Sequence, residues 1–263
     1  MFGVRGKTAH LAWYRTDDSA AEVAFLHGFS DSAQCWEPLL GEMPGVRALA
    51  IDARGHGESG LPEEPVRYTA HRDDTALVLA DQPGDGGIVV VGHSMGAMSA
   101  AYLAAARPDL VRAVVLEDPP TGESPARRND VPWSEPQWLA DVRALDLPAR
   151  IARGRSNDPD WSDDEFEPWA VSKAQVNPHL FDLPYQDPAP LTDLLAEITC
   201  PVLLIHGDTN RGSLISTEYA ARCAQAAAGD FQAVHIPNAG HSVRRDNRPR
   251  YLAALTSFLN HHR

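Results

Sequence analysis

The sequence predicts an α/β fold, with a mostly parallel central sheet and helices on both of its faces. Short, nearly continuous apolar runs alternate with helical patterns along most of the chain. Strands that are covered on both faces need such runs, because neither side of the strand meets water. Six runs fit this description, at residues 23–26, 47–51, 88–91, 113–116, 202–205 and 233–236.

Two of the predicted helices have clear end signals. The Ala-rich segment 95–106 ends at Arg107-Pro108, and the segment 218–228 ends at Gly229. Proline cannot continue a helix, and glycine commonly follows the last helical residue. Both helices directly follow or precede a predicted strand, as a parallel sheet with crossover helices requires.

The alternation fails between about residue 119 and residue 190, where prolines and acidic clusters interrupt short helical segments such as 135–144. We interpret residues 119–190 as a helical cap inserted into a core formed by residues 1–118 and 191–263. Singly, the tryptophans of this segment are typical of a small core within the cap. As a group they predict the apolar lid of a substrate pocket: Trp133, Trp138, Trp161 and Trp169.

The composition restricts the classes of partner. The chain has 263 residues, 43% hydrophobic and 22% charged, and its net charge of -13 disfavours nucleic acid. No segment approaches the roughly 20 apolar residues of a membrane helix, and the start lacks the pattern of a secretion signal. The three cysteines fit neither a disulfide framework nor a common zinc spacing. We therefore expect a cytoplasmic protein without a membrane partner, and the composition leaves a homodimer open.

Residues 92–96 (GHSMG) carry the strongest chemical signal. They follow the predicted strand 88–91 and precede the predicted helix 95–106, which is the context that a G-x-S-x-G nucleophile turn needs. The flanking glycines allow a sharp turn, so Ser94 would stand at the carboxyl edge of the sheet above the amides of the helix. Ser94 is the candidate nucleophile, against the alternative of a serine in an ordinary tight turn.

A serine hydroxyl needs a base, and the base needs an orienting anion. His241 follows the last predicted strand and precedes the final helix, so it reaches the same edge of the sheet. The other histidines fit this role less well, since they lie in the C-terminal tail, in a strand or outside the loops that follow the strands. Those near the site are expected to hold loops by hydrogen bonding: His27, His56 and His93.

Together with residues 27–29 (HGF), residues 52–59 (DARGHGES) and Gly240-His241, these motifs resemble the α/β-hydrolase fold superfamily over nearly the whole chain. The resemblance implies an α/β-hydrolase fold with an inserted helical cap. It also implies that the backbone amides of Phe29 and Met95 form the oxyanion hole. The loop 54–59 is expected to be architectural.

The acid departs from the commonest pattern of the superfamily, in which an Asp stands where this chain has Thr209. Asp208 lies one residue too early. Glu117 and Asp118 end the preceding predicted strand, where some superfamily members carry their acid, and the local sequence is similar to lactone hydrolases of the zearalenone-degrading type. We predict Asp118 as the acid and keep Asp208 and Glu117 as alternatives. Consecutive strand residues point to opposite faces, so only one of Glu117 and Asp118 can face the histidine.

The sequence therefore predicts a serine hydrolase that cleaves a carboxylic ester or lactone of a hydrophobic small molecule through an acyl-enzyme. No nucleotide-binding, metal-binding or zinc-protease motif is present, so neither a cofactor nor a metal is expected. The alternatives are hydrolysis of a C–C bond or a thioester, perhydrolysis, or ligand binding with an idle triad, since the fold does not fix the reaction.

Overall fold

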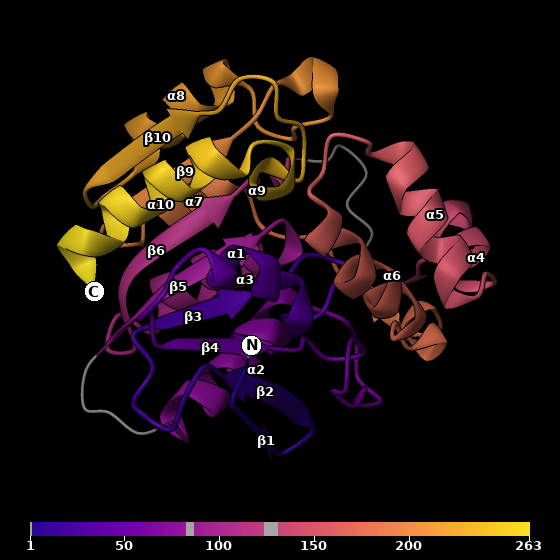
Figure 1. Cartoon of the computed structure of the whole chain (residues 1–263). Helices are drawn as coiled ribbons and strands as arrows, with labels where there is room; N and C mark the ends of the chain where they lie inside the picture. Colours follow the sequence, from indigo (N-terminus) through magenta and orange to yellow (C-terminus); the bar gives the residue numbers. More distant parts are fainter. Residues whose placement is uncertain (1, 83–86, 124–130) are drawn as a thin grey trace.

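The structure is a computed structural model that describes residues 2–82, 87–123 and 131–263. The described residues form one main sheet of eight strands (Figure 1). All neighbouring pairs from β4 to β10 are parallel, and only β1 and β2 add antiparallel pairs at one edge. The order across the sheet is β1 (Val4–Thr8), β2 (Leu11–Arg15), β4 (Ala48–Ile51), β3 (Val23–Leu26), β5 (Ile88–His93), β6 (Val111–Glu117), β9 (Val202–His206) and β10 (Phe231–His235). The predicted mostly parallel α/β sheet is confirmed.

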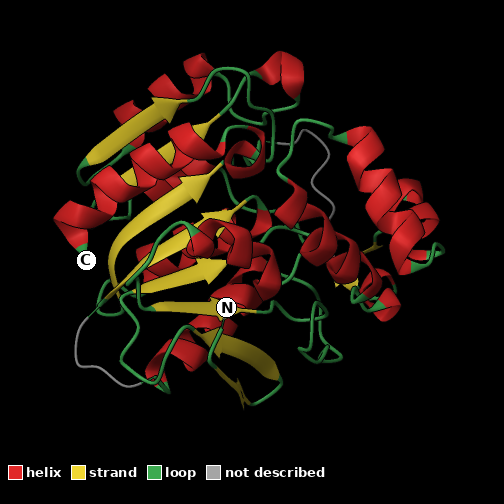
Figure 2. Ribbon diagram, in the orientation of Figure 1, coloured by secondary structure: helices red, strands yellow, loops and turns green. Residues whose placement is uncertain are grey.

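Helices cover both faces of this sheet (Figure 2). One face packs against α2 (Tyr68–Ala80), α3 (Met95–Ala106), α7 (Leu191–Leu195) and α8 (Thr217–Ala226). The other packs against α1 (Glu37–Gly41), α9 (Val243–Asp246) and α10 (Arg248–His262). In β5, Val90 enters the first core while Val89 and Val91 enter the second. The continuous apolar runs of the sequence follow from this arrangement, because both sides of each central strand are buried.

The N-terminal hairpin of β1 and β2 is absent from the six predicted strands. β1 alternates exposed and half-buried residues over a mostly polar sequence, VRGKT, which gives no apolar run. β10 also starts two residues earlier than predicted, at Phe231, and its residues are exposed or half-buried at the opposite edge of the sheet. For β1 and β10 the difference arises at the edges of the sheet, where a strand is not covered on both faces. β2 is an inner strand with residues in both cores, and its prediction was missed.

Residues 119–190 contain short elements that stand apart from the sheet order: β7 (Val131–Pro132), α4 (Gln137–Arg143), α5 (Leu147–Asn157), α6 (Phe166–Ala174) and β8 (Pro184–Tyr185). Residues 124–130 of this segment lie outside the described residues. The helix α5 begins at Leu147, because the Asp146 carboxylate accepts a hydrogen bond from the Ala149 N–H. Figure 1 shows α4 to α6 beside the carboxyl ends of the parallel strands.

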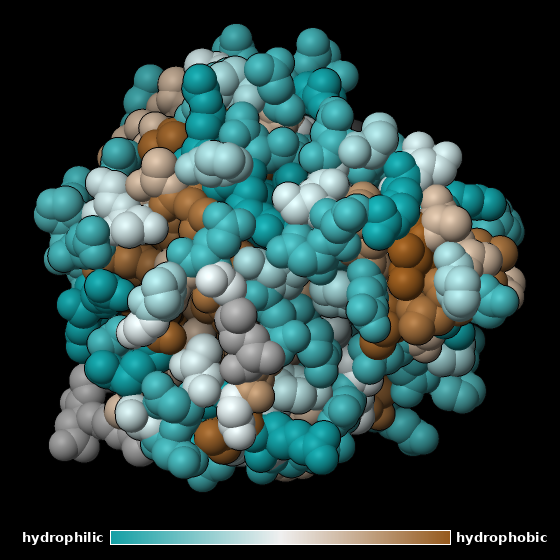
Figure 3. Space-filling view, in the orientation of Figure 1, coloured by the Kyte–Doolittle hydropathy of each residue, from teal (hydrophilic) through white to brown (hydrophobic). Residues whose placement is uncertain are grey.

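The molecular surface in Figure 3 is mostly hydrophilic, with brown apolar areas that include the region of α5 and α6. None of the helices built from the described residues combines the length and hydropathy needed to span a bilayer.

Candidate active site

Ser94 occupies the turn between β5 and α3, with φ +51° and ψ -114°. The two flanking glycines are needed because other backbone lies against them. A Cβ on Gly92 would lie 2.3 Å from the carbonyl oxygen of Gly96, and a Cβ on Gly96 would lie 2.2 Å from that of Leu26. The local sequence thus determines the sharp turn that presents the Ser94 hydroxyl at the carboxyl edge of the sheet.

Ser94, His241 and Asp118 form a connected chain of hydrogen bonds. The Oγ of Ser94 lies 3.0 Å from Nε2 of His241, and Nδ1 of His241 lies 2.6 Å from Oδ2 of Asp118. These residues come from the ends of β5 and β6 and from the loop before α9. An imidazole between a hydroxyl and a carboxylate can accept the hydroxyl proton while the carboxylate stabilises the resulting imidazolium.

The Asp118 carboxylate is fully buried and surrounded by donors. Its Oδ1 accepts hydrogen bonds from the Ser213 hydroxyl at 2.6 Å and the Ile215 N–H at 3.2 Å, and its Oδ2 accepts one from the Leu214 N–H at 2.9 Å. The Asp118 backbone has φ +43°, a conformation that Asp tolerates better than most residues. The loop 213–215 was not anticipated from the sequence, because its contribution to the site is largely through backbone N–H groups.

The two alternative acids lie elsewhere. Asp208 accepts hydrogen bonds from Nε2 of His235 at 2.7 Å and from the Asn238 N–H at 2.8 Å, so it holds together the loops after β9 and β10. Glu117 is buried and accepts hydrogen bonds from the Arg244 N–H and guanidinium. Neither carboxylate contacts His241, so the structure does not support either alternative.

The three histidines expected to hold loops do so. His27 accepts a hydrogen bond on Nε2 from the Ala53 N–H, and Nδ1 of His56 donates to the Arg54 carbonyl. His93 donates from Nε2 to the carbonyl of His241 at 3.0 Å. The turn that carries Ser94 is thereby tied directly to the loop that carries His241.

The amides of Phe29 and Met95 have no hydrogen-bond acceptor among the described residues. Met95 is the first residue of α3, so its N–H has no partner within the helix. Both residues also line the cavity that contains Ser94. These two N–H groups are therefore free to bind an oxyanion.

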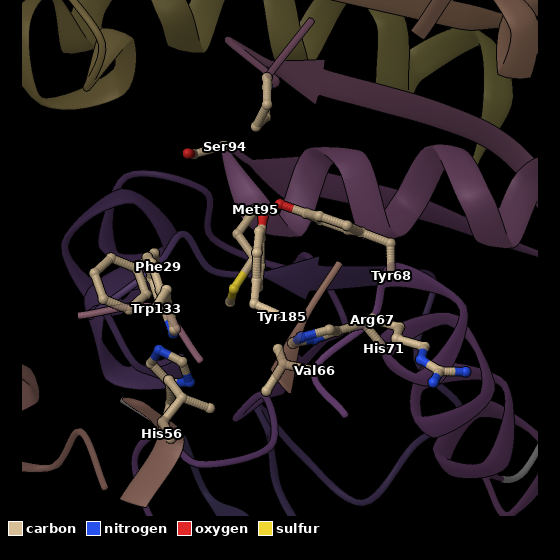
Figure 4. A pocket seen from close by; sticks show the side chains of 12 residues that line it. Phe29, His56, Val66, Arg67, Tyr68, His71, Ser94, Met95, Trp133 and Tyr185 are labelled. Carbon is tan, nitrogen blue, oxygen red and sulfur yellow. The ribbon is translucent and has the colours of Figure 1, made fainter. Parts of the chain in front are cut away.

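Ser94 opens onto a cavity of about 170 Å³ (Figure 4). Its apolar lining consists of Phe29, Val66, Met95, Pro120, Trp133 and Leu180, and its polar lining includes His56, Arg67, Tyr68, His71 and Tyr185. Burial lowers the pKa of both His56 and His71 to about 3, so both imidazoles are neutral near pH 7. His71 was not expected in the site, because it lies outside the loops that follow the predicted strands, yet it lines the cavity from α2 together with Tyr68, three residues earlier.

The prediction that four tryptophans line the pocket is correct only for Trp133. Trp161 and Trp169 pack with Phe166 in a separate apolar cluster to which residues of α4, α5 and α6 contribute. Trp138 is 48% exposed on α4. Trp161 and Trp169 therefore belong to a small separate core, which is what the tryptophans of this segment indicate when each is taken singly. The short helices α5 and α6 need such a core of their own.

A buried ionic cluster lies beside this site and connects α6 to the core. Asp31 is paired with Lys173 at 2.7 Å, with Arg245 at 3.1 Å and with Arg244 at 3.2 Å. Burial raises the pKa of the Asp31 carboxyl, but these three cations outweigh it and hold the pKa well below its usual range. Because Arg244 also binds Glu117, the cluster fixes the first turn of α9, which begins two residues after His241.

We expect Asp31→Asn to lower the free energy of unfolding by about 3–5 kcal/mol at pH 7, because it leaves three buried cations without this anion. Urea denaturation measures the change. Since the folded pKa of Asp31 is depressed, its contribution is present above the unfolded pKa of about 4 and is lost as the pH falls through the folded value. The difference between the wild type and the variant should therefore shrink below pH 4.

Asp163→Asn is the matched control, because that carboxylate pairs with Arg155 at the surface, where its side chain is 83% exposed. Its effect should stay below about 1 kcal/mol. A difference between wild type and Asp31→Asn that is small, or constant from pH 7 to pH 3, would contradict the assignment.

The model of the alpha/beta hydrolase family matches residues 23–255. A 2-(acetamidomethylene)succinate hydrolase from Mesorhizobium japonicum is 27% identical over 94% of this chain and 90% of its own length. The lipase LipV from Mycobacterium tuberculosis is 37% identical over 62% of this chain, and that match spans only 59% of LipV.

Solved structures agree with this match. The crystal structure of an E-2-(acetamidomethylene)succinate hydrolase superimposes with a TM-score of 0.72 at 25% identity, covering 95% of each chain. The esterase Rv0045c from Mycobacterium tuberculosis gives a TM-score of 0.74 at 22% identity, covering 98% of this chain and 90% of that one. The family model covers most of the chain and the whole fold agrees with it, so this chain belongs to the alpha/beta hydrolase family.

Proposed function

We propose that the protein is a serine hydrolase that cleaves a carboxylic ester or lactone through an acyl-enzyme on Ser94. The observation that carries this proposal is the hydrogen-bond chain from Ser94 through His241 to Asp118, with distances of 3.0 and 2.6 Å. Ser94 lines a largely apolar cavity together with Phe29 and Met95, whose N–H groups have no acceptor among the described residues.

In the first half of the reaction, the Ser94 Oγ attacks the carbonyl carbon while Nε2 of His241 accepts the hydroxyl proton. Asp118 orients the imidazole and stabilises its positive charge. The N–H groups of Phe29 and Met95 bind the developing oxyanion. His241 then gives its proton to the departing alkoxide as the C–O bond breaks, which leaves the acyl group on Ser94.

In the second half, a water molecule attacks the acyl-enzyme while His241 accepts its proton. Collapse of the second tetrahedral intermediate returns the proton to the Ser94 oxygen and releases the acid. In a lactone the alkoxide stays joined to the acyl group, so the same steps open a ring. The chemistry at Ser94 is identical in both cases.

The cavity favours a hydrophobic small molecule, because most of its lining is apolar and aromatic. We also propose that residues 119–190 act as its cap, since Trp133 and Leu180 from this segment line the cavity. Relatives named as esterases and a lipase support ester cleavage. A substrate screen should also include thioesters, because one structurally similar protein is a thioesterase domain. It should include amide-linked succinates, because another is an E-2-(acetamidomethylene)succinate hydrolase.

A fluorophosphonate probe and p-nitrophenyl esters test the proposal. We expect the wild-type protein to be labelled on Ser94 and to hydrolyse short-chain p-nitrophenyl esters, with no labelling of Ser94→Ala. A folded wild-type protein that neither reacts with the probe nor turns over any ester, lactone or thioester would contradict the proposal and favour ligand binding without catalysis.

A further inference from the structure

Two buried polar atoms in the lining of the cavity have no partner among the described residues: Nε2 of His56 and Nε1 of Trp133. His56 is only 1% exposed. Both rings pack against the ring of Phe29, with centroid distances of 5.7 Å for His56 and 4.9 Å for Trp133. Figure 4 shows the three side chains grouped on one side of the cavity, below Ser94 in this view.

The hydrogen-bonding character of each atom follows from its surroundings. Nδ1 of His56 lies 3.0 Å from the Arg54 carbonyl, and a carbonyl only accepts, so Nδ1 carries the proton. Because burial lowers the pKa of His56 to about 3, the ring is neutral and Nε2 keeps its lone pair. The indole nitrogen of Trp133 can only donate. The cavity wall therefore presents one acceptor and one donor.

Both atoms are already out of contact with water, and a purely hydrocarbon ligand would leave them without a partner, which forgoes the free energy of two hydrogen bonds. A carboxylate also fits poorly, because it cannot donate to His56. His71, the other imidazole of the cavity, is neutral as well. Arg67 is already engaged in an interaction within the protein, and Figure 4 shows its guanidinium directed away from Ser94. A neutral group that both donates and accepts matches this wall.

We propose that the cavity selects a substrate whose hydrophobic body carries one neutral hydroxyl or carboxamide, which donates to Nε2 of His56 and accepts from Nε1–H of Trp133. This inference rests on the proposed ester hydrolysis at Ser94 and specifies its substrate class. It makes His56 and Trp133 specificity-determining residues.

Matched substrate pairs test the selection. p-Nitrophenyl 3-hydroxybutanoate and p-nitrophenyl 3-methylbutanoate differ by one hydroxyl in place of a methyl group on the acyl side. 3-Hydroxybutyl acetate and 3-methylbutyl acetate make the same comparison on the alcohol side. After correction for the enzyme-free rates, we expect kcat/KM to favour the hydroxyl member about tenfold in one of the two pairs.

Trp133→Phe is the sharpest variant, because it removes the N–H and keeps an aromatic ring against Phe29 and Tyr185. We expect it to lower the hydroxyl-to-methyl ratio of kcat/KM towards one. If the role of Trp133 were purely structural, the variant would lower kcat/KM equally for both substrates of a pair and leave the ratio unchanged. Trp138→Phe is the matched control, since Trp138 is exposed on α4 and should not affect the ratio.

Binding of the same pairs to Ser94→Ala, measured by isothermal titration calorimetry, separates this inference from the reaction. A lower Kd for the hydroxyl member, lost in Ser94→Ala/Trp133→Phe, supports the selection even if no ester is turned over, in which case only the proposed function fails. Equal kcat/KM and equal Kd within both pairs, or a preference that survives in Trp133→Phe, would overturn the inference while leaving ester hydrolysis intact.

Discussion

Replacing Ser94 by alanine is expected to lower kcat/KM on the best ester substrate by about 10⁵-fold, because the reaction then has no nucleophile for the acyl-enzyme route. The hydroxyl is also the group that lies 3.0 Å from Nε2 of His241. Any remaining rate would come from water in a site that still holds the base and the N–H groups of Phe29 and Met95. Initial rates over a range of substrate concentrations measure the loss.

The fold should tolerate this change, because both residues carry a Cβ at the same strained backbone position, with φ +51°. Ser94→Gly should be about 1 kcal/mol more stable than Ser94→Ala, since glycine adopts positive φ without steric cost. Ser172→Ala is the matched control. It also removes a buried hydroxyl, but one that donates to the Trp169 carbonyl, so we expect activity within about threefold of wild type. An active Ser94→Ala protein would remove the basis of the covalent mechanism.

The sequence predicted the turn around Ser94 well because its requirements are local. Two glycines at fixed spacing are needed wherever backbone approaches so closely, and both close contacts are present in the structure. His241 could also be placed, because a residue that follows a parallel strand reaches the carboxyl edge of the sheet whatever lies between the strands in sequence. The strands of the sheet interior could be predicted because their residues are buried on both faces. Such burial requires a continuous apolar run, which is visible in the sequence.

The lining of the cavity could not be predicted in the same way. Aromatic residues in an inserted segment indicate burial, but they do not indicate which of two apolar clusters each one joins. Trp133 stacks on Tyr185 beside Ser94, whereas Trp161 stacks on Phe166 in the other cluster. The spacing of Tyr68 and His71 places both on one face of α2, which was the available signal for His71. That signal carries no information about what the helix face contacts.

Asp118→Asn is expected to lower kcat by about 10⁴-fold while the protein remains folded. The change removes the negative charge that stabilises the His241 imidazolium. It also introduces an NH₂ group into a site where the carboxylate oxygens accept from Ser213 and Leu214 as well as from His241. One donor must then face another, so the imidazole loses both its tautomer and its orientation. Steady-state kinetics, with circular dichroism to verify folding, measure the effect.

Asp208→Asn is the matched control, because it makes the same chemical change one strand away. Asp208 binds His235 and the Asn238 N–H rather than His241, so the variant should keep kcat within about threefold of wild type. Glu117 cannot replace the lost carboxylate, since it is held on the other side of β6 by Arg244. Near-normal turnover by Asp118→Asn together with a large loss in Asp208→Asn would reverse the assignment and require the loop after β9 to reach His241 in the working enzyme.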